Sequence, residues 1–209
     1  MTTEPSSMRN HWWWRPGWSV GRRFYTWHIT FEGQHDVHRL AAEYRSALTP
    51  LEPALTLIPD QWLHLTMQGI NFVEEIAESD IEAVVGAARS RLSAVPAFDV
   101  QFGPETIDSE AVLLPARPSE PVRSVRNAIR AAMADVLGAP NVPEQADGFT
   151  PHMSVAYSAA DGPVAPIVEA LATLDTRSAP AHISAAELIV IHRDNQMYEW
   201  QSYATVPLG

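Results

Sequence analysis

The stretches HLTMQGI, which starts at His64, and HMSVAY, which starts at His152, decide the fold of this chain. Each begins with a histidine that is followed two positions later by a hydroxyl side chain, Thr66 or Ser154. Apolar residues occupy the positions between them, which is typical of a half-buried strand whose successive side chains point to opposite faces. We therefore expect each histidine to project from its strand on the same face as its hydroxyl partner.

The elements around the two stretches occur in the same order. Apolar spacing predicts amphipathic helices over residues 36–48, 79–95, 119–137 and 163–174. Ser79 and Glu82 form the pattern of a capping box at the start of the second of these helices. Alternating, β-branched and aromatic segments predict strands over residues 24–31, 54–58, 62–70, 98–102, 111–114, 150–157, 182–192 and 198–206. In both halves a motif strand is followed by a helix and two further strands, and the unit recurs after 88 residues, from position 64 to position 152. This internal repeat predicts two related lobes that face each other.

Composition excludes several classes of protein. The chain has 209 residues, of which 46% are hydrophobic and 19% are charged, so it has enough apolar side chains for a substantial core. It contains no cysteine, which excludes disulfide scaffolds, thiolate zinc sites, iron–sulfur clusters and cysteine nucleophiles. A formal net charge of −11 disfavours broad binding to long DNA or RNA.

The start of the chain carries no sign of a targeting segment. No apolar run approaches the roughly 20 residues of a membrane helix, and the polar residues 1–10 do not resemble a signal peptide. We therefore expect a soluble, cytoplasmic protein with no membrane partner, and a loose tail over residues 1–10.

Two imidazoles and two hydroxyls that meet across a cleft suit phosphoryl transfer without a metal or another cofactor. A neutral imidazole accepts a proton from the attacking oxygen, a protonated one donates to the leaving oxygen, and the hydroxyls hold the non-bridging oxygens. A single histidine on a half-buried strand more often has a structural role. The same pair at the same place in two repeated units favours function instead.

The stretches HLTMQGI and TPHMSVAY resemble the two His-hydrophobic-Thr/Ser motifs of the 2H phosphoesterases, a family that includes the bacterial 2′-5′ RNA ligase-like proteins and cyclic nucleotide phosphodiesterases. The resemblance extends from about Phe24 to the C-terminus. It implies an α+β fold of two pseudo-symmetric lobes, each an antiparallel sheet backed by helices, around a central cleft. It also implies that His64 and His152 are the catalytic acid/base pair and that Thr66 and Ser154 bind the substrate phosphate.

The activity that this resemblance implies is that of a metal-independent phosphodiesterase acting on 2′,3′-cyclic or 2′-5′-linked ribonucleotides. The acidic chain favours a small nucleotide or an RNA end as substrate over long nucleic acid. Two alternatives stay open: a non-catalytic module that binds a nucleotide or phospho-ligand, and RNA 2′-5′ end-joining by the reverse reaction. The sequence does not indicate which histidine is the acid, nor the oligomeric state.

A third His-x-Thr pattern, formed by His28 and Thr30, lies on the first predicted strand. Its polar face is expected to border the cleft, so both residues are candidate substrate contacts, together with Tyr157. Because this pattern lacks the repeated context of the other two, we do not expect His28 to replace a catalytic histidine.

Residues 1–22 are interpreted as a tryptophan-rich extension of a single domain over residues 23–209. One interpretation is that its indole rings cover a sheet edge or the first helix. The other is that they stack on a nucleobase while an arginine, Arg15, Arg22 or Arg23, binds a phosphate.

Three other patterns are weaker. The G-x-S-x-G pattern around Ser19 lacks the strands that must precede a nucleophile elbow. His35 and His38 lie at the start of a predicted helix, where polar residues usually form a solvated first turn rather than a metal site. The arginines near the third helix are candidate phosphate ligands but are interpreted mainly as solvated surface: Arg117, Arg123 and Arg126.

Overall fold

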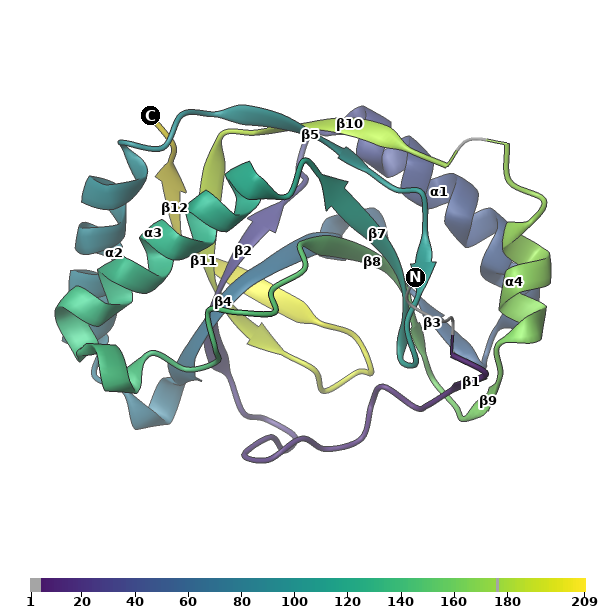
Figure 1. The fold of residues 1–209 in the computed structure, drawn as a ribbon. Coiled ribbons are helices and arrows are strands. Elements are labelled where there is room, and N and C mark those ends of the chain that lie inside the picture. Colours follow the sequence, from purple (N-terminus) through teal and green to yellow (C-terminus); the bar gives the residue numbers. More distant parts are fainter. Residues whose placement is uncertain (1–4, 176) are drawn as a thin grey trace.

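Two antiparallel sheets form the body of the molecule and meet side by side (Figure 1). The structure is a computed structural model, and it describes residues 5–175 and 177–209. The first sheet has the order β12 (Glu199–Pro207), β11 (Ala185–His192), β2 (Phe24–Thr30) and β4 (His64–Phe72). The second has the order β10 (Ala179–Ile183), β5 (Phe98–Phe102), β7 (Ala111–Arg117), β8 (His152–Ser158) and β3 (Leu55–Leu57), with β6 (Thr106–Ile107) beside β7.

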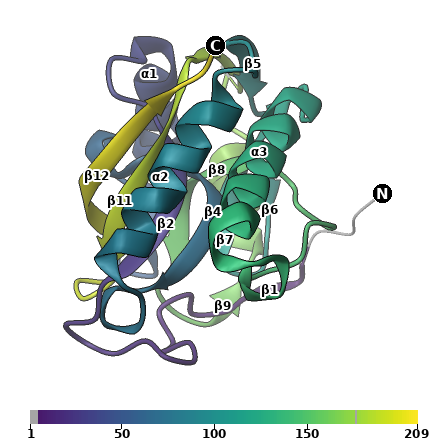
Figure 2. The same cartoon turned by 90° about the vertical axis from the view of Figure 1, so that its left-hand side faces the viewer.

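Helices cover each sheet on its outer side. Helices α2 (Glu78–Leu92) and α3 (Glu120–Leu137) pack against each other and against the first sheet, as Figure 2 shows. Helices α1 (His35–Leu48) and α4 (Ala165–Leu171) pack together on the side of the second sheet. Short 3₁₀ turns occur at Thr49–Leu51, Asp60–Trp62, Val73–Glu75 and Ala139–Asn141. The predicted α+β fold, with two lobes that are each a helix-backed antiparallel sheet, is confirmed.

The two motif strands lie next to each other where the sheets meet. β4 is an edge strand of the first sheet, and it contacts β8 of the second. Their apolar side chains face the core: Leu65 and Met67 on β4 and Met153 and Val155 on β8 are buried. The period of two along each strand therefore separates a core face from a face that carries the polar motif residues.

Most boundaries differ from the sequence-based expectation by one to three residues, and two differences have a clear physical reason. The predicted capping box is wrong, since α2 begins at Glu78 with Ala77 as its N-cap and no side-chain cap bond. Acidic Glu78 and Asp80 in the first turn favour this earlier start because they interact with the positive end of the helix dipole.

The single strand expected over residues 182–192 is also wrong. It is two strands, separated at Ser184, that belong to different sheets: β10 pairs with β5, whereas β11 pairs with β2 and β12. The buried positions have odd numbers in β10 and even numbers at Ala186 and Leu188, so the alternation shifts by one residue at the break. Two consecutive small apolar residues, Ala185 and Ala186, obscure this shift in the sequence.

The N-terminal segment, residues 5–22, is packed against the body of the protein. Its β1 (Ser7–Met8) pairs with β9 (Gly162–Pro163), and Met8 is buried in the core. The expected loose tail is therefore wrong for residues 5–10, because a buried methionine and a strand pairing hold them; residues 1–4 lie outside the described residues. In Figure 1 the rest of the segment runs from β1, beside the second sheet, to β2 in the first.

No helix in the part of the chain that the structure describes is both long enough and apolar enough to cross a bilayer.

Candidate active site

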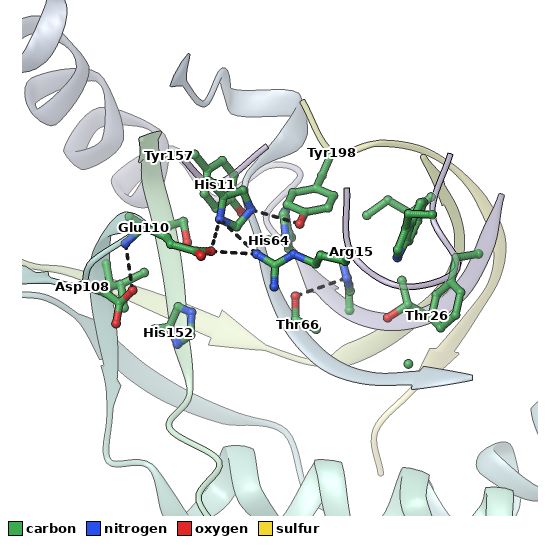
Figure 3. Close-up of a pocket in the computed structure, with 18 of the residues that line it drawn as sticks. His11, Arg15, Thr26, His64, Thr66, Asp108, Glu110, His152, Tyr157 and Tyr198 are labelled. Atoms are coloured by element: carbon green, nitrogen blue, oxygen red, sulfur yellow. Dashed lines mark hydrogen bonds and ion pairs between the residues drawn. The ribbon is translucent and has the colours of Figure 1, made fainter. Parts of the chain in front are cut away.

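A pocket of about 480 Å³ lies between the two sheets, where β4 and β8 meet. All four motif side chains line it: His64 and Thr66 from the first sheet, and His152 and Ser154 from the second. Figure 3 shows His64, Thr66 and His152 around this pocket. The folding of two strands 88 residues apart thus brings the two predicted pairs together, as the repeat predicts.

The two histidines have the same hydrogen bond on the same ring nitrogen. The Nδ1 of His64 lies 2.8 Å from the carbonyl oxygen of Trp62, and the Nδ1 of His152 lies 2.8 Å from that of Thr150. A carbonyl oxygen only accepts, so Nδ1 carries the proton in both rings. In the neutral form of either ring, the lone pair is therefore on Nε2.

His64 is held in its neutral form. Burial lowers the pKa of His64 to about 4, and the charge of His152 acts in the same direction, whereas the hydrogen bond to Trp62 opposes both. At neutral pH the free Nε2 of His64 can therefore accept a proton.

His28 is a third histidine at this site and contacts both residues of the first motif. Its ring stacks on that of His64, with centroids 4.3 Å apart and planes within 9°, and its Nε2 lies 3.4 Å from Thr66 Oγ1. Burial, followed by the neighbouring His64, lowers the pKa of His28 well below its usual value. A neutral ring therefore supports the first motif from behind.

The other two candidate contacts have different positions. Tyr157 is buried, lines the pocket and stacks on His11 with ring centroids 4.2 Å apart. Thr30 lies outside this pocket: it lines a separate one, and its hydroxyl donates to Glu187 at 2.8 Å.

The sequence-based search missed the contribution of His11 and Glu110, which also line the pocket. Glu110 accepts hydrogen bonds from Arg15 at 2.8 Å and from the Trp13 indole at 3.2 Å, and lies 3.1 Å from the Nδ1 of His11. Burial lowers the pKa of His11 to about 4, so its ring is neutral at neutral pH. No periodic pattern marks these residues; the density of tryptophan was the one signal in this part of the sequence.

The tryptophans of the N-terminal segment divide into two groups. Trp12 is buried against Tyr157, and Trp18 packs on Phe24 at the edge of the pocket. Trp13 and Trp14 are 45% and 48% exposed. Trp12 and Trp18 thus cover the sheets, whereas Trp13 and Trp14 leave large apolar surfaces open to solvent.

The three arginines in and after the tryptophan-rich segment, which are candidate phosphate-binding residues, have different surroundings. Arg15 lines the pocket, whereas Arg22 pairs with Glu74 and Glu75, and Arg23 pairs with Asp194 at 2.9 Å, outside it.

The interpretation of Arg126 as solvated surface is wrong. Its side chain is buried, and Nε donates to the carbonyl oxygen of Met67 at 2.8 Å, so Arg126 links α3 to β4. Backbone carbonyls at that interface need a donor, which explains why a charged side chain is buried there.

Over residues 5–175 and 177–209, no group of three or more His, Asp or Glu side chains is arranged to hold a metal ion.

Comparison with known proteins extends this description. The family model of the 2′-5′ RNA ligase superfamily matches residues 32–196. No curated protein matches the sequence. The fold is similar to that of TT0787 from Thermus thermophilus, with a TM-score of 0.66 and 16% identity over 90% of this chain and 97% of that one. It is also similar to E. coli LigT complexed with 3′-AMP, with a TM-score of 0.64 and 13% identity over 90% and 98% of the two chains. A conserved protein of unknown function from Agrobacterium tumefaciens, ATU0111, has a TM-score of 0.56 and 17% identity over 87% and 85%.

Proposed function

Because this chain belongs to the 2′-5′ RNA ligase superfamily, we propose that it hydrolyses 2′,3′-cyclic or 2′-5′-linked ribonucleotide phosphodiesters in the pocket between its two sheets. The observation that carries the proposal is the repeated histidine geometry. Two imidazoles line one pocket, each with Nδ1 bonded to a carbonyl two residues earlier and with Nε2 available for proton transfer.

His64 is the general base in this proposal. Its lowered pKa keeps it neutral, so Nε2 accepts a proton from the water that attacks phosphorus. His152, in its protonated form, donates a proton to the ribose oxygen as the P–O bond to that oxygen breaks. The products are a phosphomonoester and a free ribose hydroxyl, and exchange of one proton with solvent at each ring restores the starting state.

The hydroxyl groups of Thr66 and Ser154 bind the non-bridging oxygens of the same phosphate. They lie two residues after the histidines on the same strands, so each lobe supplies one proton-transfer group and one phosphate-binding group. His28 and Tyr157 border the substrate from the walls of the pocket. None of these roles needs a metal ion.

The size of the pocket supports a small nucleotide or an RNA end as substrate. A volume of about 480 Å³ falls within the range of small-molecule sites. E. coli LigT, which shares the fold, was crystallised with 3′-AMP and with ATP.

The test is turnover by the purified protein in EDTA. The four nucleoside 2′,3′-cyclic monophosphates are incubated with the wild type and with His64→Ala and His152→Ala, and 2′- and 3′-phosphate products are separated. Each substitution is expected to lower the rate at least about 100-fold, because it removes one positioned proton transfer. His35→Ala is the control, since His35 is an exposed histidine at the start of α1.

Full activity in both variants would overturn the mechanism. If the wild type binds cyclic nucleotides and 2′-5′ oligonucleotides without turning either over, the binding module is the correct alternative. If added 5′-hydroxyl RNA is converted to a longer product, the protein joins RNA ends.

A further inference from the structure

The pocket has one fixed positive charge among the described residues that line it, and that charge comes from the N-terminal segment. The lining includes four histidines and two hydroxyl-bearing motif residues, but only Arg15 contributes a guanidinium or ammonium group. A phosphodiester is an anion, and a second negative charge develops on it as water attacks phosphorus. The protonated His152 loses its positive charge as it donates its proton to the leaving oxygen, and the neutral hydroxyls and the neutral base do not balance the charge on the phosphate.

We propose that Arg15 is a further phosphate-binding residue, whose guanidinium contacts the non-bridging oxygens and stabilises the charge that develops on them. The inference rests on the proposed function, since it concerns the same pocket. It goes beyond family membership, because Arg15 lies outside residues 32–196, which the family model matches.

The position of Arg15 is held by an acidic anchor. Its Nη2 donates to Glu110 at 2.8 Å, and in Figure 3 the side chain reaches across the pocket to that carboxylate. Partial burial opposes ionisation of Glu110, but the indole of Trp13 and the charge of Arg15 hold the pKa of Glu110 below its usual value. The anchor is therefore ionised at neutral pH, and it pre-orients the guanidinium.

Arg15 has donors left for a ligand. Its Nε is buried and has no hydrogen-bond partner among the described residues. The side chain lines the pocket and is 36% exposed, and its Nη1 donates to none of the described residues, so Nη1 is the donor that a phosphate oxygen can reach. An unpaired buried donor such as Nε is costly in a folded protein, so Arg15 has hydrogen-bonding capacity that the described residues do not use.

The anchor does not cancel the local positive charge. Arg193 lies behind His11, is buried, and donates to the His11 carbonyl at 2.9 Å. His11 itself is neutral because its pKa is lowered to about 4. Arg15 pairs with Glu110, and Arg193 lies close enough to feel the charge of the same carboxylate, so these three groups together keep an excess of one positive charge.

The other two acidic residues of the pocket lining have partners of their own. Glu144 lies 3.5 Å from the guanidinium of Arg126. Asp108 is exposed, and it accepts the backbone N–H of Glu110 at 3.0 Å and the hydroxyl of Ser109 at 3.5 Å. Arg15 is thus the charged group of the lining that is best placed to meet an anion.

The experiment compares Arg15→Gln and Arg15→Lys with Arg23→Gln as the matched control. Arg23 directly precedes β2 and, like Arg15, pairs with a carboxylate, that of Asp194. Its side chain is 39% exposed, but it does not line the pocket. Two quantities are measured: the affinity for inorganic phosphate by titration calorimetry, and kcat and KM for a nucleoside 2′,3′-cyclic monophosphate.

We expect Arg15→Gln to weaken phosphate binding about 10-fold and to lower kcat/KM about 100-fold, the effect of losing one preorganised group at a developing charge. Arg15→Lys keeps the charge but loses the planar guanidinium, which can donate two parallel hydrogen bonds to a phosphate. We therefore expect its phosphate affinity and its kcat/KM to lie between those of the wild type and Arg15→Gln. Arg23→Gln is expected to stay within about twofold of the wild type.

The two readouts separate this inference from the proposed function. If the wild type hydrolyses no phosphodiester but Arg15→Gln still loses phosphate affinity, the proposed function fails and the inference stands. If the wild type is active and Arg15→Gln matches Arg23→Gln in both measurements, the inference is overturned and the proposed function stands. A wild type that does not bind inorganic phosphate also overturns the inference.

Discussion

His64 and His152 each donate a hydrogen bond from Nδ1 to a backbone carbonyl, but they lie in different surroundings. His64 is buried and stacked on His28, whereas His152 is only half-buried. The same motif on two strands thus yields two unlike imidazoles, and this difference assigns the proposed roles of base to His64 and acid to His152. The difference arises from the aromatic rings around His64: β2 supplies His28 and β12 supplies Trp200, and Tyr198 packs on the same histidine.

This assignment predicts the acidic limb of the pH profile. The base must be deprotonated, so activity is lost only as the pH falls through the lowered pKa of His64, about 4. We expect kcat/KM for a cyclic nucleotide to be as high at pH 5.5 as at pH 6.5, in a series measured from pH 4 to pH 9. An acidic limb centred near pH 6.5, the ordinary value for histidine, contradicts the assignment.

At the scale of single elements, the connection after β5 depends on a glycine. Gly103 has φ +93°, and a Cβ placed on it would lie 2.0 Å from the carbonyl oxygen of Arg177. Both the backbone conformation and the close approach of a second backbone require a residue without a side chain. This contact joins the end of β5 to the chain that leads into β10, its neighbour in the sheet.

We therefore expect Gly103→Ala to lower the free energy of unfolding by at least about 2 kcal/mol. The control is Gly86→Ala, at an exposed position in α2 where a Cβ would have no atom within 4 Å. That substitution is expected to raise stability by about 0.5–1 kcal/mol. Urea unfolding at pH 7 measures both, and equal effects of the two substitutions contradict the argument.

At the scale of the whole molecule, three buried histidines connect the site to global stability. Burial is the largest cause of the lowered pKa of His11, His28 and His64. In the unfolded chain these rings titrate near pH 6.5. Between that value and the lowered folded ones, the unfolded state binds more protons, so stability falls as the pH falls.

We expect the free energy of unfolding to decrease from pH 6.5 to pH 4.5 with a slope of up to about 1.4 kcal/mol per pH unit for each such histidine. His28→Phe keeps an aromatic ring against His64 but removes one titrating group, so its slope is expected to be smaller than that of the wild type. Urea unfolding at several pH values tests this. A stability that is constant over this range, or equal slopes for the two proteins, contradicts it.

The division into residues 1–22 and 23–209 stays a prediction. Met8 and Trp12 are buried against the body of the protein, and Arg15 reaches into the pocket. At the level of packing, the N-terminal segment is thus continuous with the rest of the structure.

Local patterns in the sequence determined the two motif faces, the four helices and most of the strands. Alternation with period two assigned His64 and Thr66 to one face of β4, and this depends only on neighbours along the chain. The assembly of both motifs in one pocket followed from the repeat, which is also visible in the sequence.

Only the tertiary structure decided the contacts that join distant segments without any repeated pattern. Arg15 and Glu110 lie 95 residues apart, and neither belongs to a periodic segment that would indicate the other. The stacking of His28 on His64 and the passage of the chain between sheets at Ser184 likewise depend on strand pairing. Side-chain periodicity reports which face of an element is buried, but it carries no information about which other segment covers that face.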